Sequence, residues 1–230
     1  MKKLLLILLL VPLVHCQGKY VCKRYSNPTP PEPPIVYPEY MVVISDSDTS
    51  GHGLTVKNTF IDEYGDSVTI GMYQGGFNDG IAYARNCGAM VYIRSFTGIS
   101  HYEDTAQVYY DRDSILSFMP LGSNTYEELT ALDTLGIIVA SGAGTDSNMT
   151  GYGNGLEFWD LDDTENAEYL SSFSNARVAA KLLKIKQTLN CTWEEARSRA
   201  RLTASNPTWD KYNGYGKINV DSAIAWTENN

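Results

Sequence analysis

Histidine, cysteine and basic residues are all scarce in this 230-residue chain. It has three histidines and four cysteines, and its 27 acidic residues outnumber its 18 basic ones to give a formal net charge of −9. Beyond the N-terminus the basic residues cluster only between positions 181 and 201, which is too small a patch to neutralise a nucleic-acid backbone. We therefore expect no nucleic-acid partner. The hydrophobic content of 43% is sufficient for one globular domain with its own core.

The scarcity of histidine and cysteine also argues against a metal centre. No two cysteines have the spacing of a zinc site, and an acidic run late in the chain does not follow the EF-hand pattern. We expect neither a metal nor a cofactor. The acidic run is predicted to be a solvated loop, with a role in specificity or calcium binding as the alternative. It contains Glu157, Asp160, Asp162, Asp163 and Glu165.

The N-terminus carries an apolar run, Leu4–Val14, that is too short for a membrane-spanning helix. Because two lysines precede it, residues 1–17 are predicted to be a secretory signal peptide. Leu13-Val-His-Cys16 has the position of a bacterial lipoprotein cleavage box, although His15 stands where a small residue is usual, so Cys16 is a candidate membrane tether. We expect a monomer that is secreted or held in the cell envelope.

A proline-rich linker follows the leader and precedes the domain. Six prolines lie between Asn27 and Pro38, a composition typical of an extended polyproline spacer. Residues 18–39 are therefore assigned to the linker and residues 40–230 to the folded domain.

Strands alternate with helices along the domain, which predicts a mainly parallel sheet with helices on both faces, an α/β fold. Between them, residues 141–159 are predicted to be a loop because they are rich in glycine and asparagine. The expected strands cover residues 41–44, 67–73, 89–96 and 136–140, and the expected helices cover 52–60, 78–86, 104–118, 125–134, 174–188, a segment from 192 and 218–226.

The chemistry centres on the stretch from Met41 to Val56. A buried strand that ends in an acid and turns into a helix exposes reactive groups at the carboxyl edge of a sheet. Outside the leader, His52 and His101 are the only imidazoles available for acid–base work. The simpler interpretation is that the glycines flanking His52 only form a turn.

Several segments occur in a characteristic order: Gly51-His-Gly-Leu-Thr-Val56, Gly80 to Ser95, Gly136 to Gly144, Ser171-Ser-Phe-Ser-Asn-Ala-Arg-Val-Ala-Ala180 and Gly214 to Ala223. Together they resemble the motifs of the subtilases, the subtilisin-like serine peptidases. The resemblance covers nearly all of residues 40–226. It implies a subtilisin-like three-layer sandwich and hydrolysis of peptide bonds through an acyl-enzyme, with a peptide or protein as the substrate.

The resemblance assigns roles residue by residue. His52 matches the general base, and Ser172 matches the nucleophile at the start of a helix, where backbone N–H groups also favour a developing oxyanion. The orienting acid is expected at the end of the first strand, at Asp46. The alternatives left open are Ser171 and Ser174 for the nucleophile and Asp48 for the acid.

The sequence departs from the family pattern at several places. His52 follows Asp46 by only six positions, where the family has about thirty residues between the acid and the histidine. Thr145 stands in place of the oxyanion asparagine, Leu170 in place of a glycine and Ala176 in place of a proline. The substrate edge is expected to comprise Ser95, Phe96, Thr97 and Gly98.

Two other functions compete with the peptidase. One is a catalytically inactive relative that binds peptides or serves a structural role, which the missing asparagine favours. The other is a GDSL-type esterase with Ser47 as nucleophile, because Val42 to Gly51 and Gly76-Phe-Asn-Asp79 resemble blocks of that family. No histidine follows His101, so the esterase would lack its usual base.

Overall fold

The structure is a computed structural model that describes residues 39–95, 103–121, 138–145, 148–149, 155–161 and 170–227. The chain divides into two units, Met1–Val36 and Tyr37–Asn230, and the described residues all belong to the second. The predicted signal peptide, Cys16, nearly all of the linker, His101 and the predicted helix 125–134 lie outside them.

The described residues form a mainly parallel sheet in the order β2-β1-β3-β4-β5-β6, with β7 paired to β5. Every pairing is parallel except that of β5 with β6. All five side chains of β1 are buried, as expected for a parallel strand covered on both faces. The strands are β1 (Val42–Asp46), β2 (Ile70–Gln74), β3 (Val91–Arg94), β4 (Leu116–Pro120), β5 (Ile138–Thr145), β6 (Asn148–Met149) and β7 (Leu156–Leu161).

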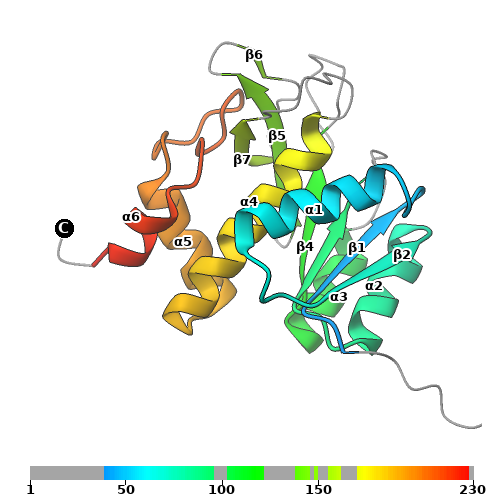
Figure 1. Ribbon diagram of the computed structural model, residues 1–230. Helices are drawn as coiled ribbons and strands as arrows, with labels where there is room; N and C mark the ends of the chain where they lie inside the picture. Colours follow the sequence, from blue (N-terminus) through cyan, green and yellow to red (C-terminus); the bar gives the residue numbers. More distant parts are fainter. Residues whose placement is uncertain are drawn as a thin grey trace, which may run out of the picture. The chain divides into compact units, whose positions relative to one another are not determined.

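Helices cover both faces of this sheet and produce three layers (Figure 1). Helices α1 and α4 pack together on one face, and α4 also contacts α5 and α6. Helices α2 and α3 pack together against β1 to β4 on the other face. The helices are α1 (His52–Tyr64), α2 (Phe77–Asn86), α3 (Glu103–Asp113), α4 (Leu170–Leu189), α5 (Trp193–Thr203) and α6 (Val220–Ala225).

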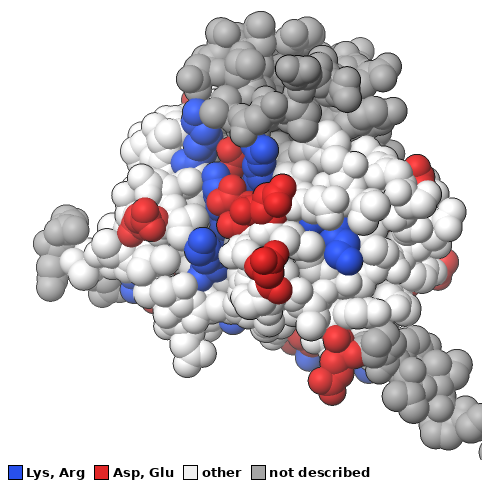
Figure 2. All heavy atoms as spheres, in the orientation of Figure 1, with Lys and Arg blue, Asp and Glu red and all other residues white. Residues whose placement is uncertain are grey.

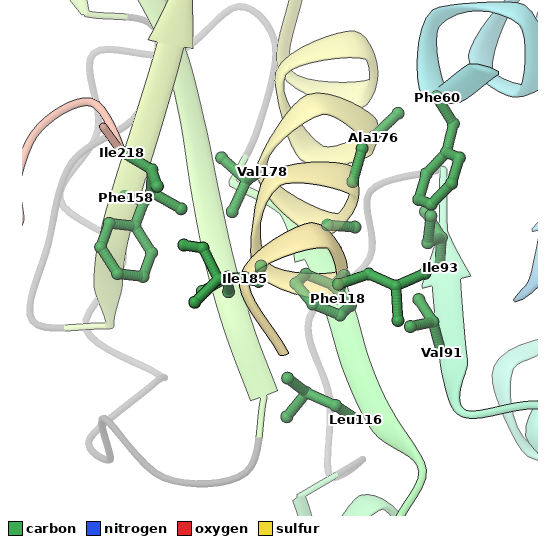
Figure 3. Close-up of a cluster of buried hydrophobic side chains, with 14 of the residues drawn as sticks. Phe60, Val91, Ile93, Leu116, Phe118, Phe158, Ala176, Val178, Ile185 and Ile218 are labelled. Carbon is green, nitrogen blue, oxygen red and sulfur yellow. The ribbon is translucent and has the colours of Figure 1, made fainter. Parts of the chain in front are cut away.

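Helix α4 is the centre of the larger hydrophobic core (Figure 3). Ala176, Val178 and Ile185 are fully buried. Ala176 lies on the side of α4 that faces Phe60 of α1, whereas Val178 and Ile185 lie on the side of Phe158 of β7. The helix contains no proline or glycine and ends at Leu189; the next residue, Asn190, takes a left-handed conformation with φ 49°. Helix α4 packs against β3, β4, β5 and β7.

The other face has a smaller core of its own. Val43, Phe77, Ile81 and Tyr92 are its main buried members, and the Phe77 and Tyr92 rings meet edge to face at 5.2 Å between centroids. Because Val43 and its neighbours in β1 alternate between the two cores, this strand joins the layers. Asp46, the predicted acid, is the last residue of this strand.

Charged residues of both signs gather on the face that carries α1, α4 and the C-terminal helices (Figure 2). Lys181 of α4 has its Nζ 2.5 Å from Asp160 Oδ2 and 3.9 Å from Glu63 Oε2. Glu157 of β7 is also buried, and its carboxylate accepts hydrogen bonds from Arg197 and Arg201 of α5. The prediction that Glu157 and Asp160 belong to a solvated loop is therefore wrong.

Two further predictions are wrong for related reasons. The predicted helix 104–118 ends at Asp113, because Ser114 takes φ 55° and the apolar run after it becomes strand β4. The predicted loop 141–159 contains the end of β5, all of β6 and most of β7. The helix prediction failed because periodicity alone does not distinguish a short buried strand from a helix. The loop prediction failed because the glycine-rich end of β5 forms a strand through its pairing with neighbouring strands.

The α/β fold with a mainly parallel sheet is confirmed. The strands predicted at 41–44 and 67–73 match β1 and β2, and the helix predicted at 174–188 matches α4 with four extra residues at its start. No helix within the described residues is both long and apolar enough to cross a membrane.

Candidate active site

Asp46 is the last residue of β1 and lies at the carboxyl edge of the sheet. It is buried, with 1% of its surface exposed. The carboxyl ends of neighbouring parallel strands meet at this edge, and the register pairs Asp46 with Gln74 of β2 and Ser45 with Arg94 of β3. Residues that follow β3 therefore come close to Asp46.

His52 is the first residue of α1, and it bends back onto Asp46. The Nδ1 atom of His52 lies 2.6 Å from Asp46 Oδ2, within the range of a charge-assisted hydrogen bond. The connection of six residues is thus long enough to join an acid and a base. On its other side, the His52 ring lies 5.7 Å from the Phe173 ring between centroids.

Ser95 is one of the residues predicted to line a substrate edge, and its side chain bonds the Asp46 carboxylate. It directly follows β3, is almost fully buried, and its hydroxyl donates to Asp46 Oδ2 while lying 3.0 Å from the Ser45 carbonyl oxygen. Sequence reasoning missed this contact. The signal was the strand register, which places the residue after Arg94 beside Asp46.

The pKa of Asp46 lies below its ordinary value. Burial by itself raises this pKa, because it disfavours the charged form. Hydrogen bonds from His52, from the Ser95 hydroxyl and from the Asp48 backbone N–H outweigh burial and lower it. The carboxylate is held ionised, as a group that orients and stabilises an imidazolium must be.

Ser172 lies in the first turn of α4 and reaches the same network. Its hydroxyl donates to the Ser95 carbonyl oxygen at 2.6 Å. The rival serines are placed differently: Ser174 accepts a hydrogen bond from the backbone N–H of Asp160, and the buried Ser171 hydroxyl has no hydrogen-bond partner among the described residues. The contacts join β1, β3, α1 and α4 through Asp46, His52, Ser95 and Ser172.

Asp48, the alternative acid, lies in the exposed turn between β1 and α1. Its Oδ1 atom accepts hydrogen bonds from the Ser50 N–H, the Ser50 hydroxyl and the Gly51 N–H. The hydroxyl of Ser50 and these N–H groups lower the pKa of Asp48. Ser47, the alternative nucleophile, lies in the same exposed turn, and its carbonyl accepts a hydrogen bond from Gln74 Nε2 at 3.0 Å.

Several predicted site residues lie beyond what the structure describes. Phe96, Thr97 and Gly98 fall outside the described residues. The backbone of Thr145 ends β5 and pairs with Asn148, but its side chain is not described. The assignments of the oxyanion donor and of the substrate edge stay predictions.

Within the described ranges, no three or more His, Cys, Asp and Glu side chains are grouped to hold a metal ion. Cys87 is a buried free thiol, and Cys191 is a half-buried one. Burial raises the pKa of both thiols, which makes each a poor nucleophile.

Comparison with known proteins gives structural matches only. No protein-family model matches the sequence, and no curated protein matches it. Among solved structures, the prenylagaramide maturation protease PagA matches with a TM-score of 0.61 and 15% identity over 82% of this chain and 93% of that one. MycP1 from Mycobacterium smegmatis matches with a TM-score of 0.59 and 14% identity over 83% and 80% of the two chains.

A third match is fervidolysin from Fervidobacterium pennivorans, described as a keratinolytic enzyme related to subtilisin. Its TM-score is 0.53, with 16% identity over 69% of this chain and 32% of that one. At these identities the likeness establishes the fold alone. The chain has a subtilisin-like α/β fold.

Proposed function

We propose that this chain is an exported serine peptidase that hydrolyses peptide bonds through an acyl-enzyme, with Asp46, His52 and Ser172 as its triad. The observation that carries the proposal is the contact between His52 Nδ1 and Asp46 Oδ2 at 2.6 Å. An acid bonded to one ring nitrogen fixes the tautomer, so that the other nitrogen is the base. The subtilisin-like fold and the short N-terminal apolar run support the proposal.

In this mechanism the hydroxyl of Ser172 attacks the carbonyl carbon of the scissile bond. Its proton passes to His52 Nε2, and His52 then gives that proton to the leaving amine as the carbon–nitrogen bond breaks. Asp46 stays ionised throughout and stabilises the imidazolium. Water, activated by His52, then hydrolyses the ester between Ser172 and the peptide and restores the enzyme.

The nucleophile must turn before it reacts. In the resting structure the Ser172 hydroxyl donates to the Ser95 carbonyl at 2.6 Å, and a hydroxyl has a single proton to donate. Rotation about the side chain transfers this hydrogen bond to His52 Nε2. The position of Ser172 three residues into α4 leaves first-turn N–H groups without helical acceptors, and these are the proposed donors to the oxyanion together with Thr145.

The peptide is proposed to add as an extended strand beside Ser95, Phe96, Thr97 and Gly98, which is how sheet edges hold peptides. A peptide N–H that bonds the Ser95 carbonyl competes directly with the Ser172 hydroxyl for that oxygen. Binding of the substrate would in this way release the hydroxyl toward His52.

Labelling with a serine-directed fluorophosphonate tests the proposal. The wild-type protein is expected to label, and both Ser172→Ala and His52→Ala are expected to abolish labelling. Ser171→Ala and Ser174→Ala are the matched controls, because they remove neighbouring hydroxyls and should keep the label when folded. Circular dichroism of every variant establishes that it is folded.

Other outcomes of the same experiment select the competing functions. A label that survives Ser172→Ala but is lost in Ser47→Ala would overturn the triad and favour an esterase. A folded wild-type protein that does not label at all would overturn the peptidase and favour an inactive peptide-binding or structural relative.

A further inference from the structure

We infer that Asp48, assisted by Gln74, is a positioning residue that holds His52 against Asp46. This inference rests on the proposed function of His52 as the general base. Asp48 acts on His52 through the backbone, so it is not itself catalytic. The inference accounts for how a connection of only six residues joins the acid to the base.

The Asp48 side chain fixes the backbone immediately before His52. Its Oδ1 accepts from the Ser50 N–H at 3.0 Å, from the Ser50 hydroxyl at 2.8 Å and from the Gly51 N–H at 2.9 Å. Gly51 is the N-cap position of α1 and has no side chain of its own for capping. The carboxylate satisfies the N–H of Gly51, at the N-cap position, and the N–H of Ser50 just before it.

The Asp48 backbone fixes the chain on the other side of His52. Its carbonyl oxygen accepts the Gly53 N–H at 2.8 Å, and its own N–H donates to Asp46 Oδ1 at 2.7 Å. One residue thus contacts the chain before His52, the chain after it and the partner carboxylate. Both oxygens of Asp46 are engaged as a result, Oδ1 by Asp48 and Oδ2 by His52.

The turn is also anchored to the sheet from the side. Gln74, at the end of β2, donates from Nε2 to the Ser47 carbonyl at 3.0 Å. The start of α1 lies very close to the end of β1 and to the turn between them. A side chain at Gly53 would place its Cβ 2.8 Å from Asp46 Cβ and 2.9 Å from the Asp48 carbonyl oxygen. Glycine at position 53 is required by this approach, because real Cβ contacts of that length do not occur.

These contacts predict a graded effect of substitution at position 48. Asp48→Ala removes all three acceptor bonds and should slow fluorophosphonate labelling by up to about a hundredfold, the cost of displacing a catalytic group by about an ångström. Asp48→Asn keeps one acceptor oxygen and should restore most of the rate. Gln74→Ala should give a smaller loss in the same direction, since it removes a single anchor.

The rates are measured per folded molecule, with Asp62→Ala as the control. Asp62 is an exposed carboxylate on the same helix, α1, so its loss should leave the labelling rate unchanged. The inference is overturned if Asp48→Ala labels at the wild-type rate. It is also overturned if Asp48→Asn is as slow as Asp48→Ala, because a shared acceptor oxygen would then have no effect.

A second measurement does not need catalysis. Proton NMR should show the downfield resonance of the His52 Nδ1 proton bonded to Asp46 in the wild type and in Asp48→Asn, and its loss in Asp48→Ala. If the wild-type protein does not label, the proposed function fails, and this resonance still decides the positioning role. A resonance that persists unchanged in Asp48→Ala overturns the inference.

Discussion

Asp46 combines two properties at the scale of a single residue: its side chain is almost inaccessible, and its pKa is lowered. Burial opposes the charge, and the bonds from His52, Ser95 and the Asp48 N–H more than offset it. A carboxylate whose pKa is lower in the folded state stabilises the fold above its unfolded pKa of about 3.9. That stability is lost as the pH falls through the folded pKa.

Asp46→Asn should therefore lower the free energy of unfolding at pH 7 by about 1.5–3 kcal/mol, the range for hydrogen bonds to a charged group. Below the folded pKa of Asp46 the wild-type carboxyl is neutral too. The free energies of unfolding of the wild type and of Asp46→Asn should then become similar. Urea unfolding between pH 7 and pH 3 measures the difference, with Asp62→Asn as an exposed control. A difference that stays constant over this pH range would contradict the explanation.

At the scale of the element, hydrogen bonds join the first two turns of α4 to β7, to β3 and to the residue after β3. Ser172 bonds the Ser95 carbonyl, Ser174 accepts the Asp160 N–H of β7, and the fully buried Asn175 donates from Nδ2 to the Arg94 carbonyl of β3 at 3.0 Å. These hydrogen bonds fix the position and the rotation of α4 relative to the sheet. They determine where the proposed nucleophile stands.

Asn175→Ala should remove about 1–3 kcal/mol from the free energy of unfolding, because it leaves the buried Arg94 carbonyl without this donor. It should also slow labelling of Ser172 per folded molecule, since the helix loses a point of attachment next to the nucleophile. Urea unfolding and fluorophosphonate labelling provide the two readouts. Lys184→Ala, at an exposed position of α4, is the control, and equal effects of the two substitutions would refute the role of Asn175.

At the scale of the whole molecule, a buried ion network ties the C-terminal helices to the sheet. Glu157 of β7 is bonded by Arg197 at 3.0 and 2.5 Å and by Arg201 at 2.9 Å. The segment after α5 then covers the same strand, because the Tyr215 N–H donates to the Glu157 carbonyl at 2.8 Å and the Trp209 indole to the Leu156 carbonyl at 2.7 Å. β7 is thereby enclosed on the side away from β5.

Glu157→Gln should cost about 3–5 kcal/mol of stability, because it leaves buried arginine charge without its counterion. The double variant Glu157→Leu/Arg197→Met should recover part of this loss, since an apolar pair avoids the cost of burying charge. Urea unfolding compares both with Glu195→Gln, which breaks an exposed pair with Arg199 and should cost under about 1 kcal/mol. A double variant less stable than Glu157→Gln would rule out this account.

The features that were predicted best from the sequence are those that depend on residues close to one another along the chain. Three features follow from local pattern: the apolar run of β1, the capping of α5 by Thr192 through the Glu195 N–H, and the body of α4 over 174–188, although not its start at Leu170. Strands β4 and β7 were missed, because each is identified as a strand by its partners in the sheet. In the site, Asp46 and His52 could be found from their order, whereas the bond of Ser95 to Asp46 depends on the register of β3 against β1.

The closeness of Asp46 and His52 along the chain also bears on the order of folding. Their contact closes a loop of six residues, whereas the contact of Ser172 with Ser95 spans 77 residues. Closing the longer loop costs more chain entropy. The contact of Ser172 with Ser95 also requires that α4 has packed on the sheet. In the proposed peptidase, a nascent chain would bring Asp46 and His52 together early and Ser172 late. It would then lack proteolytic activity until the domain is complete.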